Sequence, residues 1–138
     1  MYLLDTNVVS ELRKGARANA GVTRFIKRIA DDDAPVYISV ITLGELRRGV
    51  ELIRHRGDLA QAEALETWLQ GLLDDYADQI LEFGADEAQV WGRLRVPQPE
   101  NALDKQIAAT ALTCGLTLVT RNLRDFAATG APLHNPFE

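Results

Sequence analysis

Tyr2-Leu3-Leu4-Asp5-Thr6-Asn7 is the stretch of sequence that decides the fold. Its apolar residues run directly into a carboxylate and two short polar side chains. This pattern is typical of a buried strand that ends at a polar surface and continues into a helix. Asp5 is therefore predicted to lie at the carboxyl end of a strand. In open α/β sheets, ligands and catalytic groups collect at that edge.

The rest of the chain alternates between short apolar segments and longer segments with helical spacing. Further strands are predicted over residues 35–38, 79–83 and 116–119, and the tail over 131–138 allows at most a short edge strand because it holds two prolines. Helices are predicted over residues 6–14, 18–30, 42–55, 58–76, 86–94, 101–114 and 122–126. Strands that alternate with helices pair in parallel. The sequence therefore predicts an α/β fold, a three-layer sandwich around a central parallel sheet of about four to five strands.

Length and cysteine content favour a single cytoplasmic domain over residues 1–138. A chain of 138 residues has the usual size of one domain. The single Cys114 excludes an internal disulfide, and the first residues show neither a basic leader nor a long apolar run, which points to the reducing cytoplasm. No segment approaches the roughly 18 apolar residues that span a bilayer, so we expect a soluble protein without a membrane partner.

The net charge of −5 conceals an asymmetry along the chain. Residues 1–57 hold 10 Lys and Arg against 7 Asp and Glu, whereas residues 58–138 hold 5 against 13. The acidic total argues against indiscriminate nucleic-acid binding, although a basic half can still attract phosphates locally. Charge alone leaves the partner open.

Three later acids, Glu45, Asp104 and Asp125, stand in early helical turns or just beyond a strand, as Asp5 does. Each also has a structural interpretation. Asp5, Asp104 and Asp125 are placed where first-turn acids favour a helix dipole, and Glu45 follows Thr42 at the spacing of a capping box.

Two observations favour a functional role for individual acids. Asp104 begins the apolar stripe of its own helix, and a carboxylate on a buried face needs a partner. Glu45 lies between Gly44 and Gly49, which leave room for another molecule to approach the helix.

The strongest argument comes from the four acids as a set. A parallel sheet would bring them to one edge, where bare carboxylates repel one another strongly. Oxygen-rich clusters of this kind suit Mg²⁺ or Mn²⁺. Such a metal lowers the pKa of a bound water and neutralises charge on a phosphodiester. We therefore expect Asp5, Glu45, Asp104 and Asp125 to be both catalytic and metal-binding.

Other chemical groups give weaker signals. His55 and His134 are interpreted as solvated side chains and Cys114 as a small core residue, and the chain has no Gly-rich phosphate loop and no Gly-x-Ser-x-Gly elbow. Four arginines flank the proposed acids. Surface charge explains them most simply, but a phosphate backbone that reaches an acidic pocket needs cations at the rim. These candidates for phosphate contact, which would bind RNA if the substrate is RNA, are Arg47, Arg48, Arg121 and Arg124.

Four segments in order, residues 3–7, 39–46, 104–111 and 118–126, resemble the motifs of PIN-domain nucleases, specifically the VapC/FitB-type toxins of toxin–antitoxin pairs. The resemblance covers essentially the whole chain. It implies that the four acids form the metal site, and that nearby polar residues steady the acids or a metal-bound water. These supporting residues are Thr6, Asn7, Thr120 and Asn122. Lys105 departs from the small residue expected beside the third acid.

The same resemblance implies an activity and partners. Such proteins cut RNA endonucleolytically, often at tRNA or rRNA loops, and leave a 5′-phosphate and a 3′-hydroxyl. They form homodimers and are held inactive by a VapB/FitA-like antitoxin, whose tail wraps a helical groove and can place an Arg in the acidic pocket. Operator DNA is bound only through the antitoxin. We expect the helical hairpin over residues 42–76 to make that contact.

The sequence thus predicts a Mg²⁺- or Mn²⁺-dependent endoribonuclease, and two alternatives remain. The first is a phosphohydrolase that uses Asp5 as a nucleophile. Such enzymes usually place a second Asp two residues later, where this chain has Asn7. The second is a non-catalytic module whose acids dock the Arg of a partner.

Overall fold

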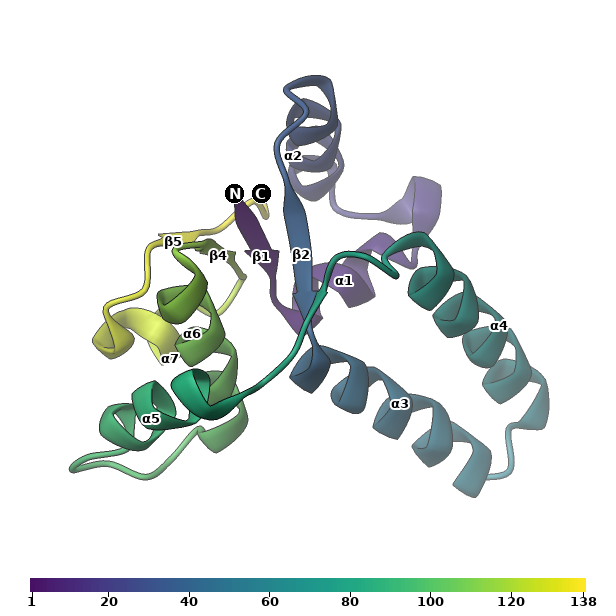
Figure 1. The fold of residues 1–138 in the computed structure, drawn as a ribbon. Coiled ribbons are helices and arrows are strands. Elements are labelled where there is room, and N and C mark those ends of the chain that lie inside the picture. Colours follow the sequence, from purple (N-terminus) through teal and green to yellow (C-terminus); the bar gives the residue numbers. More distant parts are fainter.

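The computed structural model describes residues 1–138, and its centre is a five-stranded parallel sheet (Figure 1). Its strands lie in the order β3-β2-β1-β4-β5. The strands are β1 (Tyr2–Leu4), β2 (Val36–Ser39), β3 (Ile80–Leu81), β4 (Thr117–Val119) and β5 (Leu133–His134). Every neighbouring pair is parallel, and the central strand β1 places Leu3 opposite Tyr37 on one side and Leu118 on the other. The predicted fold class is confirmed.

Helices cover both faces of this sheet. One face carries the first four, α1 (Thr6–Leu12), α2 (Ala20–Asp31), α3 (Val40–His55) and α4 (Leu59–Asp75). The other face carries α5 (Ala85–Leu94), α6 (Ala102–Cys114) and α7 (Leu123–Phe126). Figure 1 shows α3 and α4 as a hairpin that extends away from the sheet, with α5 to α7 gathered on the opposite side. None of the helices combines the length and apolarity needed to cross a bilayer.

Alternation along each strand divides the core into two clusters. Leu4, Ile38 and Val119 face the cluster under α1 to α4, whereas Leu3 and Leu118 face the cluster under α5 to α7. Because successive strand side chains point to opposite faces, each apolar strand contributes to both clusters. This double burial explains why the strands read as unbroken apolar runs in the sequence.

The start of α3 differs from the sequence-based expectation. The helix begins at Val40, because the Ser39 hydroxyl accepts the backbone N–H of Ile41 and acts as the N-cap. Thr42 is therefore a buried residue inside the helix, and the capping box proposed for Thr42 and Glu45 does not form. Glu45 is free to take another partner.

Other boundaries shift by a few residues. The first helix ends at Leu12, and a separate 3₁₀ turn follows over Gly15–Arg17. Helix α5 begins at Ala85, because Glu87 reaches back to the N–H of Gly84, so Asp86 is not its cap. Strand β3 has only two residues, since it pairs with Ile38 and Ser39 alone.

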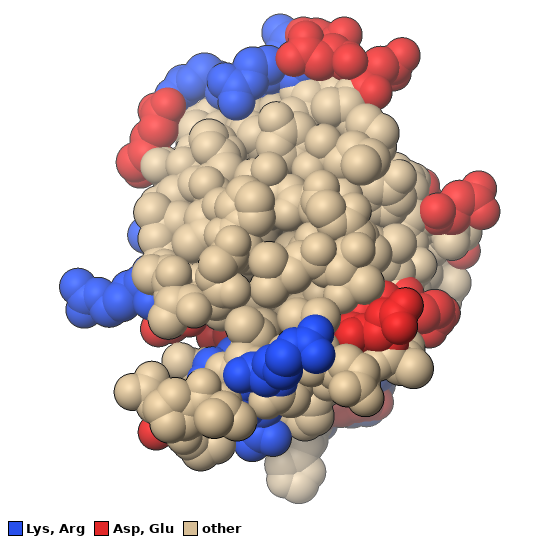
Figure 2. Space-filling view, turned by 60° about the vertical axis from the view of Figure 1, so that its left-hand side comes forward, with Lys and Arg blue, Asp and Glu red and all other residues tan.

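Charged side chains are unevenly distributed over the surface. Figure 2 shows a broad face, on the side where α5, α6 and α7 lie in Figure 1, that is almost free of Lys, Arg, Asp and Glu. The charged residues gather at its margins.

Candidate active site

Three of the four predicted acids meet at the carboxyl edge of the sheet. Asp5 follows β1, Glu45 lies in the second turn of α3, and Asp104 lies in the first turn of α6. They line a cavity of about 240 Å³ together with Thr6, Asn7 and Asn122, and no Lys, Arg or His side chain lines it.

Asp5 is the most tightly held of these acids. Its side chain is only 3% exposed. Oδ1 accepts the backbone N–H of Thr6 at 2.8 Å, while Oδ2 accepts the Thr120 hydroxyl at 2.8 Å and the Asn7 amide at 3.1 Å. Burial raises the pKa of Asp5 above its ordinary value, and the charge of Glu45 adds to this, while the three hydrogen bonds oppose it. The carboxylate is fixed at the start of α1, where it is the N-cap.

Glu45 is positioned by two threonines. The Thr6 hydroxyl donates to Oε1 of Glu45 at 2.7 Å and lies 3.1 Å from the hydroxyl of buried Thr42. Thr42 and Glu45 lie on one face of α3 because they are three residues apart. From the sequence, Thr42 was predicted only to be a helix cap. Its spacing from Glu45 was the signal that could have identified it as part of the site.

A second polar network joins α1 to the end of β4. The Thr120 hydroxyl accepts the N–H of Asn122 at 3.0 Å, and Asn7 Oδ1 accepts the N–H of Arg121 at 3.2 Å. The structure thus places the side chains of Thr6, Asn7 and Thr120 in the networks around Asp5 and Glu45, whereas Asn122 joins only through its backbone N–H.

Asp104 has no hydrogen bond to its side chain and is only partly buried. Burial, followed by the negative charges of Asp5, Asp125 and Glu45, raises the pKa of Asp104 to about 6. The carboxylates therefore repel one another, and no Lys, Arg or His side chain in the cavity lining balances their charge.

Asp125 stands apart from the other three acids. It is exposed, its side chain accepts no hydrogen bond, and it lines a neighbouring cavity of about 380 Å³ with Lys105 and Arg124. Its charge nevertheless contributes to the raised pKa of Asp104. The structure thus places Asp125 at the margin of the acidic cavity.

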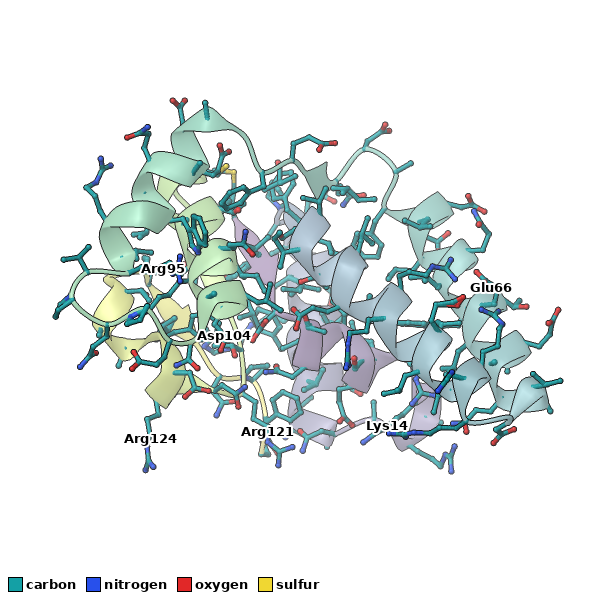
Figure 3. The ribbon with its side chains drawn as sticks, turned by 90° about the horizontal axis from the view of Figure 1, so that it is seen from below. Lys14, Glu66, Arg95, Asp104, Arg121 and Arg124 are labelled. Atoms are coloured by element: carbon teal, nitrogen blue, oxygen red, sulfur yellow. The ribbon has the colours of Figure 1, made fainter.

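The four candidate arginines have different surroundings. Arg47 forms two hydrogen bonds of 2.7 Å with Glu66 of α4, which ties α3 to α4 and occupies its guanidinium. The Arg121 guanidinium lies 4.9 Å from the ring centre of Phe137. Arg48 and Arg124 are exposed and make no ion pair. In the view from below, Arg121 and Arg124 extend outward at one margin, while Glu66 lies far from Asp104 (Figure 3).

The cavity suits a hard divalent cation. Its polar lining consists of carboxylate, hydroxyl and amide groups, and oxygen donors are what Mg²⁺ and Mn²⁺ prefer. No three Asp, Glu, His or Cys side chains lie close enough together to ligate one ion directly. Mg²⁺ usually keeps several waters and takes only one or two carboxylates. The donor set therefore fits a cation held partly through water.

An apolar groove adjoins the acidic cavity. It has a volume of about 320 Å³ between α1, α3 and α4, with Leu46, Val50, Leu65 and Trp68 in its lining. Thr6 and Glu45 line both spaces, so the groove opens toward the acids. Gly49 also lines the groove, and a Cβ there would meet no atom within 4 Å.

Neither His55 nor His134 lines the acidic cavity.

Comparison with known proteins defines the class of this fold and site. The family profile described as "PIN domain" matches residues 2–132. Toxin FitB of Neisseria gonorrhoeae is 34% identical over 143 residues, which cover 99% of each chain. VapC ribonuclease Y4jK of Sinorhizobium fredii is 31% identical over 144 residues, which cover 100% of this chain and 99% of that protein. The chain belongs to the PIN-domain family.

Solved structures place the chain within that family. The crystal structure of FitAcB from Neisseria gonorrhoeae matches with a TM-score of 0.79 at 34% identity, over 99% of this chain and 98% of the other. The structure of FitAB bound to an IR36 DNA fragment also matches with a TM-score of 0.79, at 32% identity, over 100% of this chain and 96% of the other. Within the PIN domains, this chain is therefore of the VapC/FitB type.

Proposed function

We propose that this protein is a Mg²⁺- or Mn²⁺-dependent endoribonuclease that acts as the toxin of a toxin–antitoxin pair. The observation that carries the proposal is the cavity lined by Asp5, Glu45 and Asp104 without any cationic side chain. The toxin and ribonuclease names of the relatives FitB and VapC support it.

Each acid has a role in this proposal. Asp5, Glu45 and Asp104 hold the metal directly or through water, and Asp125 completes the shell or a second site. The bound metal supplies a water of lowered pKa and neutralises charge on the phosphodiester. Thr6, Asn7 and Thr120 keep Asp5 and Glu45 in position through the hydrogen bonds described above. In the proposed hydrolysis, water adds to phosphorus and the bond to O3′ breaks, which leaves a 5′-phosphate and a 3′-hydroxyl.

The proposed substrate is a loop of tRNA or rRNA. Single-stranded loops expose their phosphates and bases to a protein site, unlike a paired helix. Arg48, Arg121 and Arg124 are available to contact phosphates at the rim, whereas Arg47 is occupied by Glu66. We therefore remove Arg47 from the set of proposed RNA contacts.

The proposed partners follow from two surfaces. A VapB/FitA-like antitoxin would place its apolar side chains in the groove between α1, α3 and α4, which leads to Glu45, and would supply any operator contact. The neighbouring structure of FitAB bound to an IR36 DNA fragment supports the proposed operator contact. A homodimer would use the nearly uncharged face in Figure 2, because charged residues are depleted at the centres of protein interfaces.

The phosphohydrolase alternative has less support. The position two residues after Asp5 holds Asn7, which cannot act as a general acid. Its side chain has a structural role instead, because it donates its amide N–H to Asp5 and accepts the N–H of Arg121. The docking-module alternative predicts partner binding that survives EDTA, together with an absence of RNA cleavage.

The test compares the wild-type protein with the Asp5→Asn variant. Each is incubated with total bacterial RNA and either Mn²⁺ or EDTA, and new 5′ ends are mapped. We expect discrete ends only with wild type and metal, and a loss of cleavage of about a thousandfold in the variant, or roughly 4 kcal/mol of barrier. Circular dichroism should show an intact fold. Full activity in a folded Asp5→Asn protein would exclude the assignment.

A further inference from the structure

A second cavity lies beside the acidic one and shares only Asp125 with the proposed metal site. It measures about 380 Å³ and lies between α7 and the loop that joins α5 to α6, residues 95–101. Apolar groups from Leu94, Val96 and Pro97 form part of its wall. The rest is mainly polar, with the neutral side chains Gln98, Asn101 and Thr129 and the charged side chains Glu100, Lys105, Arg124 and Asp125. Its volume is within the usual range for small-ligand sites, which combine apolar walls with a few polar groups.

The loop that forms this cavity is held in place at several points. Trp91 donates its indole N–H to the carbonyl of Ala102 at 3.0 Å, which ties α5 to the start of α6. Within the loop, Arg95 donates to the carbonyl of Pro99, and Lys105 donates to the carbonyl of Gln98. The Arg95 guanidinium also lies 4.8 Å from the ring centre of Trp91. The cavity is therefore built before any ligand arrives, which lowers the ordering cost of binding.

Several side chains in the cavity wall have unused binding capacity. Asn101 occupies the N-cap position of α6 but makes no capping hydrogen bond, and the Gln98 amide makes no hydrogen bond either. Asn at an N-cap normally accepts a backbone N–H, so its freedom here is unusual. Val96 is 77% exposed, the highest value among the exposed large apolar side chains. Apolar and hydrogen-bonding surface thus lie side by side.

The cavity shares two walls with the acidic site. On α6, Asp104 faces the acidic cavity and the next residue, Lys105, faces the second one. On the segment after β4, Asn122 lines the acidic cavity while Arg124 and Asp125 line the second. Figure 3 shows Asp104 with Arg95 on this side of the molecule and Arg124 at its outer margin. A group bound here would lie next to a phosphate at the acids.

An unpaired nucleobase matches these features. A base has apolar faces that Val96 and Pro97 can contact, and a polar edge that amides such as Gln98 and Asn101 can read. The neighbouring phosphate carries a charge that Arg124 can meet, since it makes no ion pair within the chain. Single-stranded RNA supplies both groups, because its bases can turn out of the stack.

We propose that this cavity binds the unpaired base next to the cut and so selects the nucleotide at that position. The inference rests on the proposed endoribonuclease function and adds to it the part of the chain that reads sequence. Gln98 and Asn101 would contact the base edge, whereas Lys105 is a positioning residue that acts through the Gln98 carbonyl.

The experiment uses a pool of short single-stranded RNAs of randomised sequence, incubated with Mn²⁺ and the full chain. Cleavage sites are sequenced for wild type, Gln98→Ala and Asn101→Gly. The glycine variant removes the side chain at a backbone φ of +56°, which glycine adopts without strain. Gln89→Ala, an exposed glutamine of α5 outside both cavities, is the matched control.

We expect wild type and Gln89→Ala to share one base preference at a position next to the cut. Gln98→Ala or Asn101→Gly should weaken that preference about fivefold or more, which is the loss expected for a base contact. Slower cleavage by both variants with an unchanged preference would mean a structural role and would overturn the inference alone. An absence of metal-dependent cleavage by the wild type, in both this pool and total RNA, would overturn the proposed function and the inference together.

Discussion

The two walls of the acidic cavity are held in different ways. On one wall, Asp5 accepts three hydrogen bonds and Glu45 accepts one, from residues that are themselves part of the networks. On the other wall, the side chain of Asp104 accepts none, and neither does that of Asp125 at the margin of the cavity. The first wall keeps its geometry without any cation. The second wall carries the Asp104 carboxylate of α6, and the like charge of Asp125 on α7 lies at its margin.

The difference shows in the ionisation of the acids. Hydrogen bonds partly offset the burial of Asp5, since donors stabilise its charged form. Asp104 has no such donors, and burial and neighbouring charges raise its pKa to about 6. A bound cation would therefore stabilise the second wall most, while the first wall positions the ion.

Metal binding gives the largest expected effect on stability. A concentration of Mn²⁺ one hundred times its dissociation constant should stabilise the wild-type protein by about 2.7 kcal/mol. Because Asp104 belongs to the wall without hydrogen bonds, Asp104→Asn should lose most of this gain. Urea denaturation with Mn²⁺ and with EDTA measures both. Asp78→Asn, an exposed acid outside the cavity, should respond to Mn²⁺ like wild type. Equal stabilisation of Asp104→Asn and wild type would contradict the comparison.

On the hydrogen-bonded wall, Thr120→Val should destabilise the protein by about 1–3 kcal/mol. The substitution keeps the volume but removes the donor to Asp5 and the acceptor for the Asn122 N–H. Urea denaturation in EDTA measures the loss. Thr117→Val, on the strand β4 that directly precedes Thr120, removes no side-chain hydrogen bond and should change stability by less than about 0.5 kcal/mol. Equal effects of the two substitutions would show that the network contributes nothing.

On the other wall, Asp104→Asn should have the opposite effect in EDTA and stabilise the folded protein. The folded-state pKa of Asp104 is about 6 and its ordinary value is 3.8, so the native state binds more protons than the unfolded state between these pH values. The contribution of Asp104 to the free energy of unfolding is therefore fully present below about pH 4 and is lost as the pH rises to 6. The upward shift of the Asp104 pKa corresponds to at most about 3 kcal/mol of stability. Solvent screening of the partly exposed side chain reduces this to about 1–2 kcal/mol.

The Asn variant should accordingly be more stable than wild type by about 1–2 kcal/mol at pH 7, and the gain should shrink toward pH 4. Urea denaturation at the two pH values, without metal, measures the change. A gain that is the same at both pH values would have a cause other than ionisation.

Asp125→Asn should have the smallest effect on stability, within about 0.5 kcal/mol, because the side chain is exposed and accepts no hydrogen bond. Denaturation in EDTA at pH 7 provides the check. A loss above about 1 kcal/mol would place Asp125 in the scaffold with Asp5.

Much of the fold could be predicted because its strands are buried on both faces. Leu3 and Leu4 point to opposite clusters, so the first strand is apolar throughout and ends sharply at Asp5. The start of α3 was misplaced because Ser39 and Thr42 are both acceptable caps, and only tertiary contacts decide between them. The hydroxyl of Thr6 approaches Thr42 from another helix, which no local pattern shows.

The placement of Asp5, Glu45 and Asp104 at one edge was predictable from the parallel sheet. The separate position of Asp125 was not, because α7 is too short to carry a clear periodic pattern. The pairing of Arg47 with Glu66 was also hidden, since it depends on how α4 folds back on α3. The cavity beside Asp125 depends on the path of loop 95–101, which sequence spacing does not determine.

The position of β1 in the middle of the sheet also affects how the protein is made. Its neighbours are β2, about 35 residues later, and β4, about 115 residues later. Chains emerge from the ribosome with the N-terminal part first. While residues 104–125 are still being synthesised, the growing chain carries Asp5 and Glu45 without the opposite wall of the cavity. The acidic cavity is thus completed only after the segment over residues 104–125 has been made, so an enzyme of this design would be inactive until that segment has folded.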